Sequence, residues 1–468
     1  MKYNNMVLSK NEVEFLHGQT LELLEKKGIH FEHEGALATF KENGCKTDGN
    51  VVFFTRDQVE KAVNLSPRAF DWESRQATAR VDGREKGLYG SAAGPAFFMD
   101  PDGTVRRGSL EDYRKLAKIV DTSDVIDFGH SLLVDIGDVP TERSPYIQVA
   151  NLLKYMDKPI NLTAMQTPEE SVNTVARKQI QMIKRFYGKE EGNVVLGGAC
   201  ATAPMHYGTT DVDAILGFLE ENQPISLIAC SLPVITSHAS VTGTIVQNNA
   251  EVLAGLVLVQ MTRPGTPFVY ATISSSVNLR TVSALFGSAE VALMSAATAS
   301  LADYYEVPYR SGGSLTDAIA VDYQAGVESV YNLAPIILSD VDVMQFSCGS
   351  LGSLNITSLE KYVLDEESLK MALRMKQGLG IDTDKSYIEG ILPINHKGHF
   401  MTGPTPKEYF DEHFISDLFT KTDYNNWQQK DGKALMEKAE ERVKIRLDAY
   451  QEKSFDPAQL KIIEDYLD

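Results

Sequence analysis

Residues able to do chemistry gather near the ends of apolar stretches of this chain. Three of the four cysteines, Cys200, Cys230 and Cys348, stand at such ends. Thiolates bind zinc, and a zinc-thiolate site there would serve to activate a methyl acceptor. Free cysteine is also one of the residue types buried most often, so packing in the core is the competing interpretation for all three.

Aromatic residues and one arginine occupy comparable positions. Aromatic faces hold quaternary ammonium groups by cation–π attraction, worth roughly 0.5–2 kcal/mol for each ring. Arg310 offers a guanidinium that binds a carboxylate through two parallel hydrogen bonds. Core packing of each ring and a structural salt bridge of Arg310 are the alternatives.

Other signatures of catalysis are weak or missing from the sequence. Few carboxylates stand at the ends of the apolar stretches, which gives little support to hydrolysis by paired carboxylates. The chain contains no GxSxG, Walker A or HExxH sequence, and Leu196-Gly197-Gly198-Ala199 lacks the glycine spacing of a dinucleotide site. No acid–base pair stands out.

Eight apolar stretches rich in β-branched residues must position these side chains. They recur at intervals of roughly 30 to 45 residues and begin near Leu88, Val125, Ile160, Val194, Ile225, Phe268, Val307 and Val341. Parallel strands buried on both faces have this nearly continuous apolar character and need long crossover connections. The pattern predicts an α/β fold, a (β/α)₈ barrel, with a doubly wound open sheet as the alternative because spacing does not show closure.

In such a barrel the active site lies at the carboxyl ends of the strands. The ends of the eight stretches supply a candidate set, in chain order: Phe97, Phe98, Asp127, His130, Asn161, Thr163, Cys200, Thr202, His206, Tyr207, Cys230, Ser231, Tyr270, Thr272, Ser274, Tyr309, Arg310, Gly312, Gly313, Gln345, Phe346, Ser347 and Cys348. The two histidines are interpreted as structural.

Three regions are expected along the chain: an amino-terminal helical extension (1–80), the catalytic barrel (81–355) and a carboxy-terminal helical segment packed on the barrel (356–468). The first is predicted as helix, loop, helix. Ser9 and Glu12 form a capping box at its start, and Ser66-Pro67 closes its second helix. The charged carboxy-terminal helices are expected to cover the barrel or to make an oligomer contact.

Composition narrows the class of protein further. The 468 residues carry a net charge of -19, which repels phosphate backbones and argues against nucleic-acid binding. Neither a signal peptide nor an apolar stretch of about 18 residues is present, so no membrane span is expected. Four scattered cysteines do not make a disulfide framework, and a reducing cytoplasm is the expected compartment.

Longer segments resemble the trimethylamine methyltransferase family. They are NNAEVLAGLVLVQMTRPGTPFVYATIS, FGSAEVALMSAATASLADYYEVPYRSGGSLTDA and DYQAGVES, together with the amino-terminal HFEHEGALATFKENGCKTDGNVVFFT. The likeness covers nearly the whole chain. It implies a (β/α)₈ barrel that donates a substrate methyl group to the Co(I) corrinoid (cobalamin) of a small partner protein, with no tightly bound cofactor of its own.

One departure from that family carries most of the information. Its methylamine-specific members place pyrrolysine, an electrophilic imine, in the segment corresponding to GGSLTDA, and this chain has Leu315 there. Leucine offers neither an electrophile nor a hydrogen bond. The resemblance therefore implies the branch that acts on quaternary amines such as glycine betaine, proline betaine or carnitine, and not on trimethylamine.

The expected roles follow from this reaction. A quaternary ammonium releases a neutral amine without needing a proton, so positioning and exclusion of water are the protein's tasks. We expect an ammonium cage from Phe97, Tyr207, Tyr270 and Phe346, and carboxylate recognition by Arg310 and Gln345. Close backbone approach is expected at Gly312 and Gly313, unless they only form a tight turn, and Leu315 is expected at the pocket floor.

Two other functions are also compatible with the sequence. One is a zinc-dependent corrinoid methyltransferase that uses Cys200, Cys230 and Cys348. The other is a protein that binds betaines without turning them over. A leucine at 315 in place of pyrrolysine is also compatible with a relative that has lost its catalytic activity. A homo-oligomer is possible, and the sequence does not show which quaternary amine is used.

Overall fold

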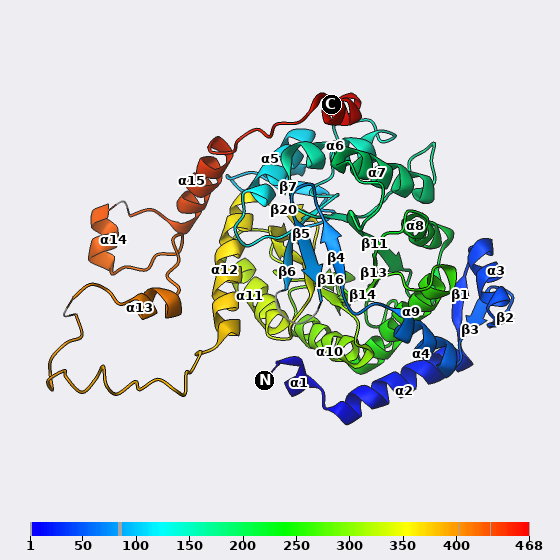
Figure 1. Ribbon diagram of the computed structural model, residues 1–468, viewed down its shortest axis with the longest axis horizontal. Helices are drawn as coiled ribbons and strands as arrows, with labels where there is room; N and C mark the ends of the chain where they lie inside the picture. Colours follow the sequence, from blue (N-terminus) through cyan, green and yellow to red (C-terminus); the bar gives the residue numbers. More distant parts are fainter. Residues whose placement is uncertain (1, 83–86, 402, 431, 468) are drawn as a thin grey trace.

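The computed structural model describes all residues except 1, 83–86, 402, 431 and 468. Eight parallel strands form the central sheet, in the order β6, β18, β17, β14, β13, β11, β10, β9. Their bounds are β6 (Leu88–Ser91), β9 (Gly129–His130), β10 (Ile160–Leu162), β11 (Val195–Ala201), β13 (Ile225–Ala229), β14 (Phe268–Thr272), β17 (Tyr309–Ser311) and β18 (Val343–Cys348). A parallel bridge between Gly90 and Phe128 joins β6 to the segment that leads into β9. The sheet is thus a barrel, as the eight stretches predict, and the open sheet is excluded (Figure 1).

Helices follow the strands and surround the barrel (Figure 1). They are α5 (Leu110–Asp121), α6 (Ser144–Tyr155), α7 (Val172–Tyr187), α8 (Thr209–Glu220), α9 (Val241–Thr262), α10 (Ala289–Tyr305), α11 (Tyr323–Ile337) and α12 (Leu359–Gln377). Side chains at several helix starts accept a hydrogen bond from the first turn, as Ser109, Ser171 and Ser240 do. Such caps separate the helices cleanly from the loops at the carboxyl ends of the strands.

The amino-terminal region contains more than the expected helix, loop, helix. Between α2 (Lys10–Lys26) and α4 (Arg56–Leu65) lie a third helix, α3 (Glu34–Glu42), and three short strands, β1 (Ile29–Phe31), β2 (Lys46–Asp48) and β3 (Val51–Phe53). Strand β1 also pairs with β12 (His206–Tyr207), which follows barrel strand β11. The strands escaped prediction because each is three residues long and is stabilised by pairing partners rather than by its own pattern. A short helix, α1 (Asn4–Val7), precedes them.

The predicted helix boundaries of this region are confirmed. Ser9 accepts from the Glu12 amide, and the Glu12 carboxylate accepts from the Ser9 amide, so the capping box is present. Helix α4 ends at Leu65, directly before Ser66 and Pro67. The limits placed at residues 80 and 355 between the three regions stay a prediction.

A hairpin closes the amino end of the barrel. It consists of β4 (Phe70–Glu73) and β5 (Thr78–Val81). Its Trp72 is completely buried and packs with Phe128 at 5.0 Å between ring centres, in one cluster with residues from the starts of the barrel strands. This plug leaves the carboxyl end as the open end of the barrel.

Additional strands stand at the carboxyl end. Strands β7 (Phe97–Met99) and β8 (Val105–Arg107) follow β6, and β19 (Ser350–Leu351) and β20 (Ile356–Thr357) follow β18; the four form one sheet. The hairpin of β15 (Ser276–Asn278) and β16 (Ser283–Leu285) follows β14. These loops extend the barrel wall around its mouth.

The carboxy-terminal region returns to the barrel only in part. It contains α13 (Lys407–Glu412), α14 (Tyr424–Lys430), α15 (Leu435–Asp448), α16 (Pro457–Ile463) and a final 3₁₀ turn, η1 (Glu464–Tyr466). Helix α15 packs on α12 and α5, and the partly buried ion pair of Arg446 with Glu366 at 2.6 Å fixes it there. The preceding stretch stands away from the barrel (Figure 1). Within the described residues, no helix is long and apolar enough to cross a membrane.

Candidate active site

A cavity of about 240 Å³ lies at the carboxyl ends of the barrel strands, and all eight strands or the loops directly after them line it. Its lining residues are Ala93, Gly94, His130, Leu132, Thr163, Cys200, Ile228, Cys230, Ala271, Thr272, Ile273, Arg310, Ser311, Gly312, Gln345, Phe346 and Leu354. The volume is below the roughly 300–1,000 Å³ of pockets for drug-sized ligands. The cavity therefore suits a small metabolite. It lies at the carboxyl ends of the strands, where the sequence predicts the site.

Arg310 supplies the charge of the cavity. Its side chain comes from β17, is 6% exposed, and donates from Nη1 to the Ser226 hydroxyl at 3.4 Å. Its Nε has no hydrogen-bond partner, and within the described residues no carboxylate lies within ion-pair distance. Burial lowers the pKa of the guanidinium to about 10, so it stays charged at neutral pH. A buried, incompletely bonded cation is an arrangement that calls for an anionic ligand group.

The neighbouring polar groups supply acceptors and no general acid. The Gln345 side chain donates from Nε2 to the Ser91 carbonyl, and its Oε1 has no partner. Burial, with a smaller effect of the Arg310 charge, lowers the pKa of His130 to about 3, so this imidazole is neutral. Its Nδ1 accepts from the Leu132 amide at 3.0 Å, and its Nε2 lies 3.3 Å from the Thr163 hydroxyl. None of the described lining residues is an aspartate or a glutamate.

Phe346 faces the cavity from a distorted part of β18. Its φ angle is 59°, a left-handed value that an aromatic residue rarely adopts. The pairing of β18 with β6 shifts register between Met344 and Cys348, which makes room for this bend. The Ser314 amide donates to the Phe346 carbonyl at 2.8 Å and stabilises it. Strained residues of this kind concentrate at functional sites.

The other three aromatic residues of the expected cage do not line the cavity. Tyr207 is completely buried on β12, outside the barrel, where its ring stacks on Phe31 and its hydroxyl donates to the Glu251 carbonyl. Tyr270 points into the helix layer, because its hydroxyl donates to Asn249 of α9 at 2.7 Å. Phe97 belongs to the sheet above the barrel, with the Arg107 guanidinium 4.9 Å from its ring centre. A four-ring cage around one ligand is therefore wrong in this fold.

The loop after β17 places three residues of interest in different surroundings: Gly312, Gly313 and Leu315. Gly312 lines the cavity, and the Cδ1 atom of Leu315 lies 2.7 Å from where a Cβ would stand on Gly312. Leu315 is 1% exposed and lies behind Gly312 rather than on the cavity surface. Gly313 packs against Met344 and the Phe346 carbonyl, with no room for a Cβ. Leucine at 315 thus supports the cavity wall from behind, which corrects its expected place at the pocket floor.

The three cysteines do not form a metal site. Cys200 and Cys230 line the cavity, whereas Cys348 is completely buried in the core. Burial raises the pKa of all three thiols, for Cys230 to about 12, so they are protonated as long as no metal ion is bound. Within the described part of the chain, three metal-binding side chains converge only beside β1, where they are His30, Glu32 and His206, and no cysteine is among them. The zinc-thiolate interpretation is not supported.

Several lining residues were missed by sequence reasoning. Leu132, Ile273 and Leu354 come from loops, and Ala93 and Gly94 follow β6. Small and aliphatic residues of this kind carry no chemical signal, so nothing in the sequence distinguishes them from ordinary core residues. Ser311, whose buried hydroxyl has no partner, could have been predicted from the sequence, because it directly follows Arg310.

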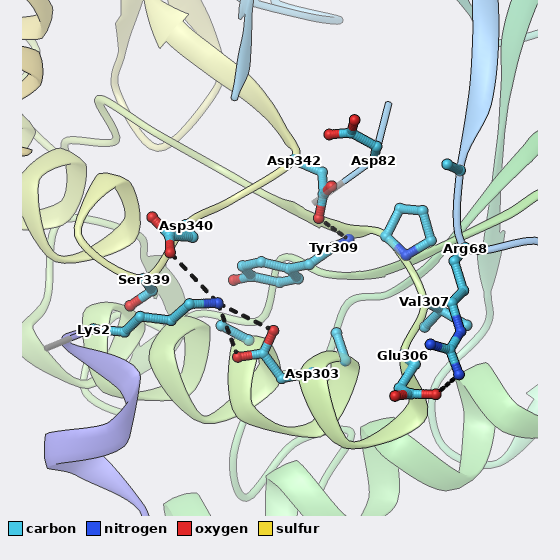
Figure 2. Close-up of a pocket in the computed structure, with 14 residues that line it drawn as sticks. Lys2, Arg68, Asp82, Asp303, Glu306, Val307, Tyr309, Ser339, Asp340 and Asp342 are labelled. Carbon is cyan, nitrogen blue, oxygen red and sulfur yellow. Dashed lines mark hydrogen bonds and ion pairs between the residues drawn. The ribbon is translucent and has the colours of Figure 1, made fainter. Parts of the chain in front are cut away.

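A second cavity, of about 550 Å³, lies at the opposite end of the barrel (Figure 2). Its walls come from the starts of β17 and β18 and from the segment before β4. Figure 2 shows Lys2 between Asp303 and Asp340, each 3.4 Å away, and Asp342 accepting from the Tyr309 amide. The amino end of such barrels serves stability. Its two cations, Lys2 and Arg68, are paired with Asp303, Asp340 and Glu306, so the small cavity at the mouth is the candidate active site.

Fold and site define a class of (β/α)₈-barrel enzymes with a small cavity at the mouth, which here contains one buried guanidinium and, among its described lining residues, no carboxylate. The chain belongs to the trimethylamine methyltransferase family, because the profile of that family, described as trimethylamine methyltransferase (MTTB), matches residues 2–468.

Curated relatives of similar length agree with this membership. The chain is 32% identical to a proline betaine:corrinoid methyltransferase of Eubacterium limosum, over 100% of this chain and 98% of that protein. It is 31% identical to an L-carnitine:corrinoid methyltransferase of the same organism, covering 96% and 94% of the two chains. A glycine betaine methyltransferase of Desulfitobacterium hafniense (strain Y51) is also 31% identical, over 92% and 89%.

A solved structure shares the fold. The monomethylamine methyltransferase (MtmB) of Methanosarcina barkeri superimposes with a TM-score of 0.53 over 98% of this chain and 86% of that one, at 10% identity. This likeness extends to the barrel architecture and not to individual site residues.

Proposed function

We propose that this enzyme transfers a methyl group from a carboxylate-bearing quaternary amine to the Co(I) corrinoid of a partner protein. The observation that carries the proposal is the Arg310 guanidinium, buried without a carboxylate partner in a cavity lined by no acidic residue. A betaine or carnitine brings a carboxylate for this charge, and trimethylamine does not. The three relatives described above are named for substrates of this class.

In this proposal the substrate lies with its carboxylate on Arg310 and its ammonium group toward Phe346. The free Gln345 Oε1 is an acceptor, so it suits polarised N-methyl groups better than the carboxylate expected for it from the sequence. One aromatic face contributes about 0.5–2 kcal/mol of cation–π attraction. Ile228, Ile273 and Leu354 complete an apolar wall that excludes water from the methyl groups.

The cavity's lack of a general acid fits this reaction. As a methyl group leaves a quaternary ammonium, the nitrogen becomes a neutral tertiary amine and needs no proton. A neutral His130, held by Leu132 and Thr163, neither gives nor takes one. The chain's contribution is then to hold the methyl carbon at about 3–3.5 Å from its acceptor and to keep the site dry. The corrinoid of the partner supplies the nucleophile.

The mouth of the barrel offers room for the partner. A groove of about 420 Å³ adjoins the cavity and shares Gly94 and Leu132 with it. Large apolar side chains are exposed on the loops after β10, β13, β14 and β17; we call them the mouth rim, and they are Met165, Val234, Ile235, Leu279, Val282 and Ile319. Exposed apolar groups around a site entrance are typical of a protein-binding surface.

A substrate panel tests the proposal. Purified protein is incubated with Co(I)-cobalamin and, in turn, glycine betaine, proline betaine, carnitine, choline or trimethylamine, and methylation is followed by absorbance. At least one zwitterion is expected to react, while choline, which lacks a carboxylate, and trimethylamine react far more slowly. Turnover of trimethylamine, or of choline at an equal rate, contradicts the proposal. Tight binding of a betaine with no methyl transfer, also to the reduced partner protein, would make this a binding protein instead.

A further inference from the structure

A long excursion of the carboxy-terminal region carries apolar side chains that nothing in the described part of the chain covers. We call residues 378–412 the arm. Among its described residues, eight large apolar side chains are at least half exposed in the first two thirds of its length: Leu379, Ile381, Tyr387, Ile388, Ile391, Leu392, Phe400 and Met401. Figure 1 shows this segment standing away from the barrel. Single exposed apolar residues are ordinary, but a contiguous set of this size marks an interaction surface.

Hydrogen bonds hold the two ends of the arm together, whereas the residues between these ends stand away from the barrel. Arg374, in the last turn of α12, donates to the carbonyls of Gly378 and Glu412, both at 2.8 Å. These two residues are the first and the last of the arm, so one guanidinium joins its ends. The arm is thus a closed excursion with a defined base rather than a loose tail.

A second uncovered apolar surface lies beside this base. Helix α11 exposes Tyr323, Val327, Val330 and Tyr331, which are spaced to lie on one helix face. Helix α12 packs against α11 and exposes Met371 and Met375 in its last turns. We call these six residues the α11 face. A helix that covers a barrel normally presents polar residues to water, so this face also lacks a partner.

The arm and the mouth of the barrel are expected to bind different partners. Lys376 at the end of α12 forms an ion pair at 3.0 Å with Asp340, which precedes β18. The arm therefore leaves the molecule at the amino end of the barrel, opposite the mouth rim. A protein that receives the methyl group at the mouth does not reach it.

We propose that the arm of one copy of this chain packs on the α11 face of a second copy, and that the exchange is reciprocal. Each chain carries both halves of this contact side by side, which is the condition for a self-complementary twofold interface. At roughly 60–120 Å² for each large apolar side chain, the eight residues bury about 500–1,000 Å², and a stable interface takes about 800 Å² from each partner. Residues 379–401, which carry the eight apolar side chains, contain three acidic residues and two lysines. This part of the arm is therefore nearly neutral in a chain of net charge -19, and two copies meet there without strong repulsion.

Sedimentation velocity and light scattering on the full chain test the exchange with two double variants. Ile388→Asp with Leu392→Asp alters the arm, and Val327→Asp with Tyr331→Asp alters the α11 face. The unchanged protein is expected to have twice the mass of one chain, and each variant alone the mass of one chain. Because all four side chains are exposed in the single chain, the circular dichroism spectrum is expected to stay unchanged, whereas Tm is expected to fall only by the stabilisation that the dimer contact contributes. Phe15→Asp, at an equally exposed apolar position on α2, is the matched control and stays a dimer.

Mixing the two variants gives the sharper result. A pair made of one arm variant and one face variant retains one intact arm on one intact face, so dimers are expected to reappear in the mixture. A single-chain mass for the unchanged protein, or a dimer that survives the arm substitutions, overturns the proposal. A mixture that stays single-chain overturns the reciprocal exchange of arms.

Discussion

Arg310 is held inside the barrel by a single long hydrogen bond to Ser226, and this makes its charge available to a ligand. The replacement Arg310→Met keeps much of the side-chain volume and removes the charge. We expect the affinity for the reactive betaine to fall at least about 100-fold, since breaking a buried charge pair costs on the order of 3 kcal/mol. Titration calorimetry measures this loss.

Choline provides the control for Arg310, because it has the ammonium group and lacks the carboxylate. Its weak binding is expected to be equal or stronger in the variant, as the repulsion between Arg310 and the ligand cation is gone. If betaine affinity falls less than about tenfold, the carboxylate is held elsewhere.

Asp342 makes stability depend on pH at the other end of the barrel. Burial is the main cause that raises its pKa to about 7, with further raising by Asp303 and Asp82, while the Tyr309 amide and Lys2 act in the opposite direction. Its pKa in the unfolded chain is near 3.8, so the native state binds the extra proton between about pH 4 and 7. The free energy of unfolding therefore falls as pH rises through this window.

The replacement Asp342→Asn removes this dependence. Asparagine keeps an acceptor for the Tyr309 amide and carries no charge at any pH. At pH 8 the variant is expected to be more stable than the unchanged protein by on the order of 2 kcal/mol, and at pH 4 about equally stable. Thermal unfolding across pH 4–8 measures both, and an equal slope for the two proteins would contradict the raised pKa.

Residue types predicted the polar part of the site better than the apolar part. Arg310, Gln345, Phe346 and Gly312 line the cavity as expected. Arg310 and Gln345 were recognisable because burying a polar group needs a reason, whereas the strained backbone of Phe346 is visible only in the structure. Tyr207 and Tyr270 were misplaced because a tyrosine near a strand end points either inward or into the helix layer, and the chemistry of the ring is the same in both cases.

At the scale of elements, the eight barrel strands were predictable because each is a buried apolar stretch with its own local pattern. The β4–β5 hairpin was not, although it closes the barrel. Its Trp72 is completely buried against residues that begin the barrel strands. The contact joins segments far apart in the sequence, so only the folded chain shows it.

Trp72→Ala tests the hairpin as a plug. We expect a loss of about 3–5 kcal/mol in the free energy of unfolding, since a large buried ring leaves a cavity behind. Urea unfolding measures it, and KM for the substrate stays unchanged because the active site is at the opposite end. Arg80→Ala in the same hairpin is the matched control: its ion pair with Asp71 is more than half exposed, so its loss is expected to cost less than about 1 kcal/mol. Similar losses for both variants would mean that the hairpin does not depend on Trp72.

The two ends of the barrel have different roles. The hairpin plug and the charge network lie at the amino end, and the cavity and the mouth rim lie at the carboxyl end. Two residues of the mouth rim, Val234 and Val282, have positive φ angles of 71° and 54°, which are strained for β-branched residues. Aspartate tolerates this backbone better than valine does. The double replacement by Asp therefore alters the rim without adding backbone strain.

This rim variant is expected to lose methyl transfer to the corrinoid partner protein by at least about tenfold, a loss of roughly 1.4 kcal/mol. Transfer to free cobalamin is expected to stay the same, because the cavity is intact. Parallel assays with the two acceptors measure the difference. Unchanged rates with the partner protein would place its docking surface away from the rim.

The sequence by itself determined the number and order of the strand–helix units, the acidic charge and the arginine, Arg310, near the end of a barrel strand. These depend on hydrophobic period and residue type, which are local. Only the tertiary structure decided which side chains face the lumen, that Leu315 lies behind Gly312 rather than in the cavity, and that Cys348 is separated from Cys200 and Cys230. In short strands the facing of a side chain is set by closure of the barrel and register against neighbours, and these are properties of the whole sheet.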